Sequence, residues 1–156
     1  MSMKRRTFLQ GALACSGIGI AIGAGQLTPR TVLAAWPQAA FSAKTANDVI
    51  PALFGSDEVS ENEAVVLSVK TEGEINPASL PVKVSTALPA ESITIIAEKN
   101  HIPLIATFEL TPALEAYVST KIKFAQSSNV MAIVKANGKL YSAKKYVTIT
   151  KAGCAG

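Results

Sequence analysis

The segment VMAIVKANGKLYSAKKYVTIT, residues 130–150, decides the fold of this chain. Two apolar runs, rich in β-branched and aromatic residues, flank the dipeptide Asn137-Gly138. A tight type I′ hairpin turn needs positive φ at both central positions, which asparagine and glycine adopt more readily than other residues. The segment therefore predicts a β-hairpin with strands over Val130–Lys135 and Lys139–Thr150.

The same alternation of apolar and polar residues precedes this hairpin. A period of two begins near Ala64 and recurs in short runs separated by turn residues. With the hairpin these runs make seven strands, which predicts an all-β fold, an immunoglobulin-like antiparallel β-sandwich. We expect one polar face on each strand, and we expect Pro81 to place its strand at a sheet edge, because proline donates no ladder hydrogen bond. The five earlier strands are predicted over Val65–Lys70, Leu80–Ser85, Ile93–Glu98, Ile105–Leu110 and Tyr117–Phe124.

One short N-terminal helix is predicted ahead of the strands, over Ala46–Gly55. Asn47 or Asp48 is expected to cap its start, and Gly55 is expected to end it. Pro51 fits this helix only in the first turn, where a missing N–H removes no intrahelical hydrogen bond.

The first 35 residues resemble a cleavable twin-arginine export signal. Arg5 and Arg6 form the arginine pair in the run KRRTFLQ at residues 4–10, and a glycine-rich, weakly apolar stretch follows. The run VLAA at residues 32–35 provides a small-residue cleavage site. A retained membrane anchor is less favoured because the stretch is shorter than the roughly 20 apolar residues of a span. A lipoprotein cysteine at Cys15 is also disfavoured, because Ala12 stands where leucine is expected. We expect a periplasmic mature protein without a membrane anchor.

Removal of residues 1–35 changes the charge balance. The chain has 15 basic and 11 acidic residues, and four of the basic ones lie in the predicted signal. The remainder has 11 lysines against 11 acidic residues, so the basic excess typical of nucleic-acid binding is absent. The acids come mainly early and many lysines come late. This pattern indicates either an ordinary solvated surface or a basic end that steers a partner.

Cys154 is the most informative single residue for function. It follows the last predicted strand and is the one cysteine left after removal of the signal. A thiolate forms persulfides and mixed disulfides reversibly, so a thiol on a flexible tail suits a covalent carrier. A tail of small residues would also enter a narrow cleft. The predicted carrier tail, residues 151–156, comprises Lys151, Ala152, Gly153, Cys154, Ala155 and Gly156.

Two other function classes compete with the carrier interpretation. One is a non-catalytic interaction domain in which Cys154 is incidental or forms an intermolecular disulfide. The other is a thiol enzyme acting alone, which needs an activated cysteine with acid–base neighbours that this tail lacks.

Other candidate sites are weak. His101 is the single histidine and is predicted in a surface loop without metal ligands at suitable spacing. The sequence has no Cys-x-x-Cys pair, no c-type haem attachment motif and no glycine-rich phosphate loop. Trp36 and Phe41 are expected either to pack on the sandwich or to dock a partner subunit. We therefore predict no catalytic residue, no metal site and no cofactor beyond sulfur on Cys154.

These residues together resemble SoxY, the sulfur-carrier family of the Sox thiosulfate-oxidising system. The resemblance rests on the twin-arginine leader, the Trp36-Pro37 start, the Ile93–Leu110 region, the hairpin GKLYSA at residues 138–143 and the cysteine of the tail. The family tail usually ends Gly-Gly-Cys-Gly-Gly. Here Ala152 and Ala155 replace two of those glycines, which makes positive φ less accessible at both positions.

The resemblance implies a carrier cycle and a set of partners. A second small β-protein, SoxZ, would form a heterodimer with the chain. A c-type cytochrome would join thiosulfate to the cysteine, a manganese hydrolase would release sulfate, and a sulfane dehydrogenase, where present, would oxidise the remaining sulfur. The implied domain order is a signal peptide at 1–35, an immunoglobulin-like sulfur-carrier domain at 36–150 and the carrier tail at 151–156.

Overall fold

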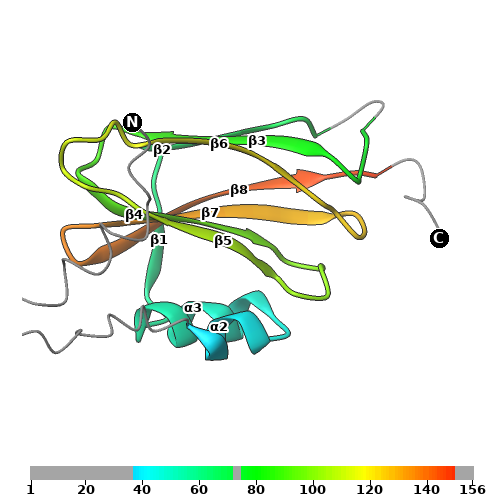
Figure 1. Cartoon of the computed structure of the whole chain (residues 1–156), viewed down its shortest axis with the longest axis horizontal. Coiled ribbons are helices and arrows are strands. Elements are labelled where there is room, and N and C mark those ends of the chain that lie inside the picture. Colours follow the sequence, from blue (N-terminus) through cyan, green and yellow to red (C-terminus); the bar gives the residue numbers. More distant parts are fainter. Residues whose placement is uncertain (1–36, 72–74, 150–156) are drawn as a thin grey trace, which may run out of the picture. The chain divides into compact units, whose positions relative to one another are not determined.

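The structure is a computed structural model that describes residues 37–71 and 75–149 (Figure 1). Within those ranges the chain forms two helices and eight strands. The helices are α2 (Gln38–Ser42) and α3 (Ala46–Phe54). The strands are β1 (Val59–Glu61), β2 (Val65–Val69), β3 (Leu80–Thr86), β4 (Ala90–Ala97), β5 (Leu104–Glu109), β6 (Tyr117–Ile122), β7 (Ser128–Ala136) and β8 (Lys139–Val147).

The strands form two sheets that pack face to face. One sheet has the order β1-β8-β7-β4-β5 and the other has the order β2-β3-β6. The predicted immunoglobulin-like β-sandwich is confirmed, and the predicted hairpin joins β7 to β8 with positive φ at Asn137 (53°) and Gly138 (70°). All the strand pairs are antiparallel except β1 with β8, which is parallel. The sequence pattern predicted neither β1 nor this parallel pair.

The main core lies between the two sheets. Alternate residues of β2, β3 and β6 face alternate residues of β4 and β7, as the period of two predicts. Val82, Val84, Ile93, Ile95 and Val134 are fully buried there. Each such side chain contributes about 1.5–3 kcal/mol relative to an exposed position, so this core is the main source of stability.

A second core lies on the other face of the five-stranded sheet, where α2 and α3 cover it (Figure 1). The helices contribute Ala40, Ala46, Val49 and Ile50, which pack against Ile96, Leu104, Met131, Ile133 and Leu140 of the sheet. The expectation of one polar face per strand is therefore wrong for β4 and β7. Both faces of these central strands are covered, one by the second sheet and the other by the helices.

Helix α3 matches the predicted helix, with two differences at the residue level. Thr45 caps the N-terminus, since its Oγ1 accepts a hydrogen bond from the Asp48 N–H at 3.2 Å, so the prediction of Asn47 or Asp48 is wrong. Pro51 lies inside the helix, beyond the first turn, so the expectation that it lies in the first turn is wrong. Gly55 ends the helix as predicted, with φ of 71° and its N–H donated to the Pro51 carbonyl at 2.9 Å.

Helix α2 was not predicted, and it contains Phe41. The five-residue helix places Ala40 in the second core and brings Phe41 partly buried against it. Packing on the sandwich, one of the two options for this residue, is thus observed for Phe41. Trp36 lies outside the described residues.

Strand β3 is central, so the prediction that Pro81 marks an edge strand is wrong. β3 pairs with β6 over Leu80–Ser85 and with β2 only from Val82 onward. Pro81 thus has a sheet neighbour on one side, and proline is tolerated because the β2 ladder has already ended at that position.

Candidate functional site

The base of the predicted carrier tail is fixed to one end of the sandwich. Val147, the last residue of β8, is fully buried. The Thr148 N–H then donates to the Thr71 carbonyl at 3.2 Å, and the Ile149 N–H donates to Ser127 Oγ at 2.8 Å. The Ile149 side chain packs against the main core. The chain is therefore held to the domain up to Ile149.

The residues predicted for the carrier tail, Lys151, Ala152, Gly153, Cys154, Ala155 and Gly156, lie outside the described residues, as do Arg5 and Arg6 of the export signal. The fixed point at Ile149 still sets a limit on the tail. Cys154 is the fifth residue after Ile149, and five residue steps of extended chain span at most about 17–18 Å. The Cα of Cys154 therefore lies within that distance of the Cα of Ile149.

Side-chain amides connect the loops around this end of the sandwich. Asn100, in the β4–β5 loop, donates from Nδ2 to the Lys123 carbonyl and accepts the Ala125 N–H at Oδ1, both at 2.8 Å. Gln126 Nε2 donates to the Lys99 carbonyl at 3.1 Å. These bonds hold the β4–β5 loop against the β6–β7 loop that contains Ser127. The surface from which the tail leaves is therefore built by several loops that support one another.

Asn100 and Ser127 were missed by the sequence reasoning. Their partners lie more than 20 residues away in the chain, and both residues occur in polar loop sequences that indicate only a turn. No local pattern could have identified them.

His101 lies exposed in the β4–β5 loop, as predicted. Among the residues that the structure describes, no three His, Cys, Asp or Glu side chains come close enough to hold a metal ion. The same part of the chain contains no helix long and apolar enough to cross a membrane.

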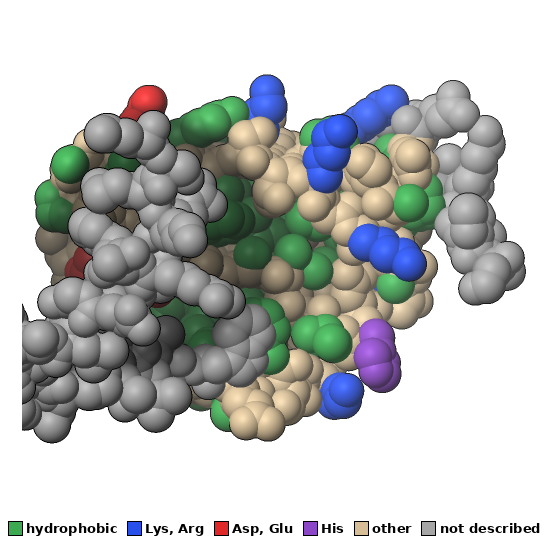
Figure 2. All heavy atoms as spheres, in the orientation of Figure 1, with side chains coloured by type: hydrophobic (Ala, Val, Ile, Leu, Met, Phe, Trp, Pro, Cys, Tyr) green, Lys and Arg blue, Asp and Glu red, His purple; other side chains and the backbone are tan. Residues whose placement is uncertain are grey.

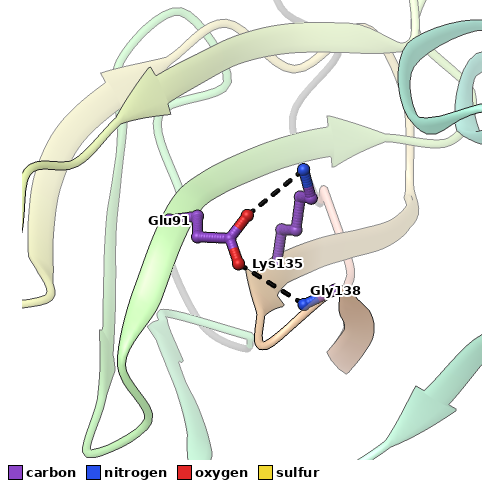
Figure 3. A network of polar contacts seen from close by, with 3 residues as sticks. All are labelled: Glu91, Lys135 and Gly138. Atoms are coloured by element: carbon purple, nitrogen blue, oxygen red, sulfur yellow. Dashed lines mark hydrogen bonds and ion pairs between the residues drawn. The ribbon is translucent and has the colours of Figure 1, made fainter.

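The opposite end of the sandwich contains an ion pair that supports the hairpin turn (Figure 3). Glu91, at the start of β4, accepts from Lys135 Nζ at 3.2 Å and from the Gly138 N–H at 3.4 Å. The Lys135 hydrogen bond, with the Gly138 N–H, lowers the pKa of Glu91 from its ordinary value. Both side chains of the pair are nearly half exposed, at 43% and 47%, so solvent screens it. The arrangement stabilises the turn.

The relationship of the chain to known proteins follows from its match to a family model. Residues 50–154 match the model of the sulfur oxidation protein SoxY. This chain belongs to the SoxY family. The sulfur carrier protein SoxY from Chlorobium limicola f thiosulfatophilum is 35% identical, and its structure matches over 70% of this chain and 100% of that one, with a TM-score of 0.62.

Other solved structures match the chain more weakly. Superoxide reductase (neelaredoxin) from Ignicoccus hospitalis is 17% identical over 56% of this chain and 80% of its own, with a TM-score of 0.47. That likeness is too low to carry a functional argument. Among curated protein sequences, none matches the chain.

Proposed function

We propose that this chain is a periplasmic sulfur carrier that holds thiosulfate-derived sulfur covalently on Cys154 and presents it to the enzymes of a sulfur-oxidation pathway. The observation that carries the proposal is membership of the SoxY family over a match that extends to residue 154. The structure supports the proposal further, because the chain is held to the domain as far as Ile149 and Cys154 is the fifth residue after it.

The chemistry assigned to Cys154 begins with an oxidative conjugation. The Cys154 thiolate and the outer sulfur of thiosulfate would form an S–S bond, and a c-type cytochrome would serve as the oxidant that accepts the two electrons released, one at a time. The product is a cysteine S-thiosulfonate. Water would then attack the terminal sulfonate sulfur in a manganese hydrolase, which releases sulfate and two protons and leaves a persulfide anion on Cys154. The thiolate is the reacting form in the first step.

The remaining parts of the proposal concern partners and location. A SoxZ-like β-protein forms a heterodimer with the chain, and a sulfane dehydrogenase, where present, oxidises the persulfide. Export follows the twin-arginine route through Arg5 and Arg6, with cleavage before Trp36. The carrier has no catalytic group of its own in this scheme, because the partner enzymes supply the oxidant and the metal and the solvent supplies the water.

The test is the intact mass of the mature protein after incubation with thiosulfate and the cognate thiosulfate-conjugating cytochrome, before and after a thiol reductant. A reductant-labile adduct on the tail peptide, absent in Cys154→Ser, is the expected result. A chain with Ala152→Gly and Ala155→Gly restores the usual family tail and serves as the positive control. Loading of that control but not of the natural chain would favour the non-catalytic interaction domain.

A further inference from the structure

The end of the sandwich from which the tail leaves has a distinctly basic surface. Lys99 and Lys123 lie in the two loops joined by Asn100 and Gln126, next to Ser127 at the tail base. Lys83 and Lys121 lie on the outer face of the three-stranded sheet, where Lys83 pairs with Ser119 and Lys121 with Pro81. We call these four residues, Lys83, Lys99, Lys121 and Lys123, the basic end.

All four side chains of the basic end are exposed. None of them forms an ion pair with another residue in the described part of the chain. The described strands β2, β3 and β6 contain no acidic residue. The positive charge of the basic end is therefore available to a binding partner.

Among the residues that the structure describes, most acidic side chains lie away from the basic end. Glu91, Glu109 and Glu115 belong to the other end of the sandwich, near the starts of β4 and β6. Glu98, at the tail end, accepts a hydrogen bond from Asn129 Nδ2 at 2.8 Å. Figure 2 shows the same separation on the uncovered part of one face, with lysines toward the end where β8 finishes and acids at the opposite side. Among the described residues, lysines are thus concentrated toward the tail end and acids toward the opposite side.

We propose that the basic end docks on an acidic protein surface that rims the cleft into which the carrier tail is inserted. The inference rests on the proposed carrier function. The tail reaches at most about 17–18 Å from Ile149. When the tail enters a cleft of a partner, the rim of that cleft must therefore lie close to the domain surface around the tail base. That surface contains the basic end. A balanced net charge gives no overall attraction, so orientation of the tail toward the cleft depends on where the exposed charges lie.

The experiment compares two double variants with the same change in net charge. Lys121→Glu with Lys123→Glu reverses two charges of the basic end. Lys44→Glu with Lys139→Glu reverses two exposed lysines outside it and is the matched control. The rate of adduct formation on Cys154 by the thiosulfate-conjugating cytochrome is measured as kcat/KM over a range of ionic strength. Reaction of Cys154 with a neutral maleimide checks that the thiol itself is unaffected.

We expect kcat/KM to fall about ten-fold at low salt in the basic-end variant, with a flatter salt dependence, and to stay within about two-fold in the control. Equal rates for the two variants, with the natural chain loading normally, would overturn the docking proposal and leave the carrier function intact. Absence of loading in the natural chain would refute the carrier function instead.

Discussion

Replacement of Ser127 by alanine should loosen the base of the carrier tail. Ser127 Oγ accepts the partly buried Ile149 N–H at 2.8 Å, which is a well-formed neutral hydrogen bond. Such a bond contributes about 1 kcal/mol net. Because 1.4 kcal/mol corresponds to a factor of ten, the local opening equilibrium at Ile149 should rise about five-fold.

Native-state hydrogen exchange of the Ile149 amide measures this opening directly. We expect the exchange rate to rise about five-fold in Ser127→Ala. The Thr148 amide, which is donated to the Thr71 carbonyl, should change much less. Ser119→Ala is the matched control, since Ser119 lies exposed on β6 and forms no hydrogen bond through its side chain. An unchanged Ile149 rate in Ser127→Ala, or an equal rise in the control, would refute the reasoning.

Two further predictions concern stability. Gly55→Ala should lower the free energy of unfolding by about 1–2 kcal/mol in a urea titration, because φ of 71° strains a residue with a Cβ although nothing lies within 4 Å of it. Gly55→Asn, which tolerates this conformation better, should lose less, and equal losses would contradict the explanation. Glu91→Gln tests the lowered pKa of Glu91. A carboxylate with a lowered folded-state pKa stabilises the fold above its unfolded-state pKa, near 4.3, and loses that contribution as the pH falls through the folded-state value. The stability difference between the natural chain and Glu91→Gln should therefore be positive at pH 7 and shrink as the pH falls below the unfolded-state pKa and through the lower folded-state pKa. A difference that does not depend on pH would show that the ion pair with Lys135 contributes nothing.

The candidate site was only partly predictable from the sequence. Cys154 was identified from its residue type, its place in the chain and its small neighbours, all of which are local properties. The fixed base at Ile149 depends on Ser127 and Thr71, which are distant in sequence and meet only in the folded protein. The basic end likewise combines Lys83 and Lys99 with the later Lys121 and Lys123, whereas the sequence indicated only a late run of lysines.

The sequence by itself determined the seven predicted strands, the Asn137-Gly138 hairpin and the Gly55 helix end. Alternation, positive φ and capping act over a few neighbouring residues, so a linear pattern records them. Only the tertiary structure decided the parallel β1–β8 pair, the central place of β3 despite Pro81, and the burial of both faces of β4 and β7. The physical reason is that each of these depends on a neighbour distant in sequence. The runs around Ile96 and Ile133 are apolar on both faces, but only the folded protein shows that two helices cover the second face.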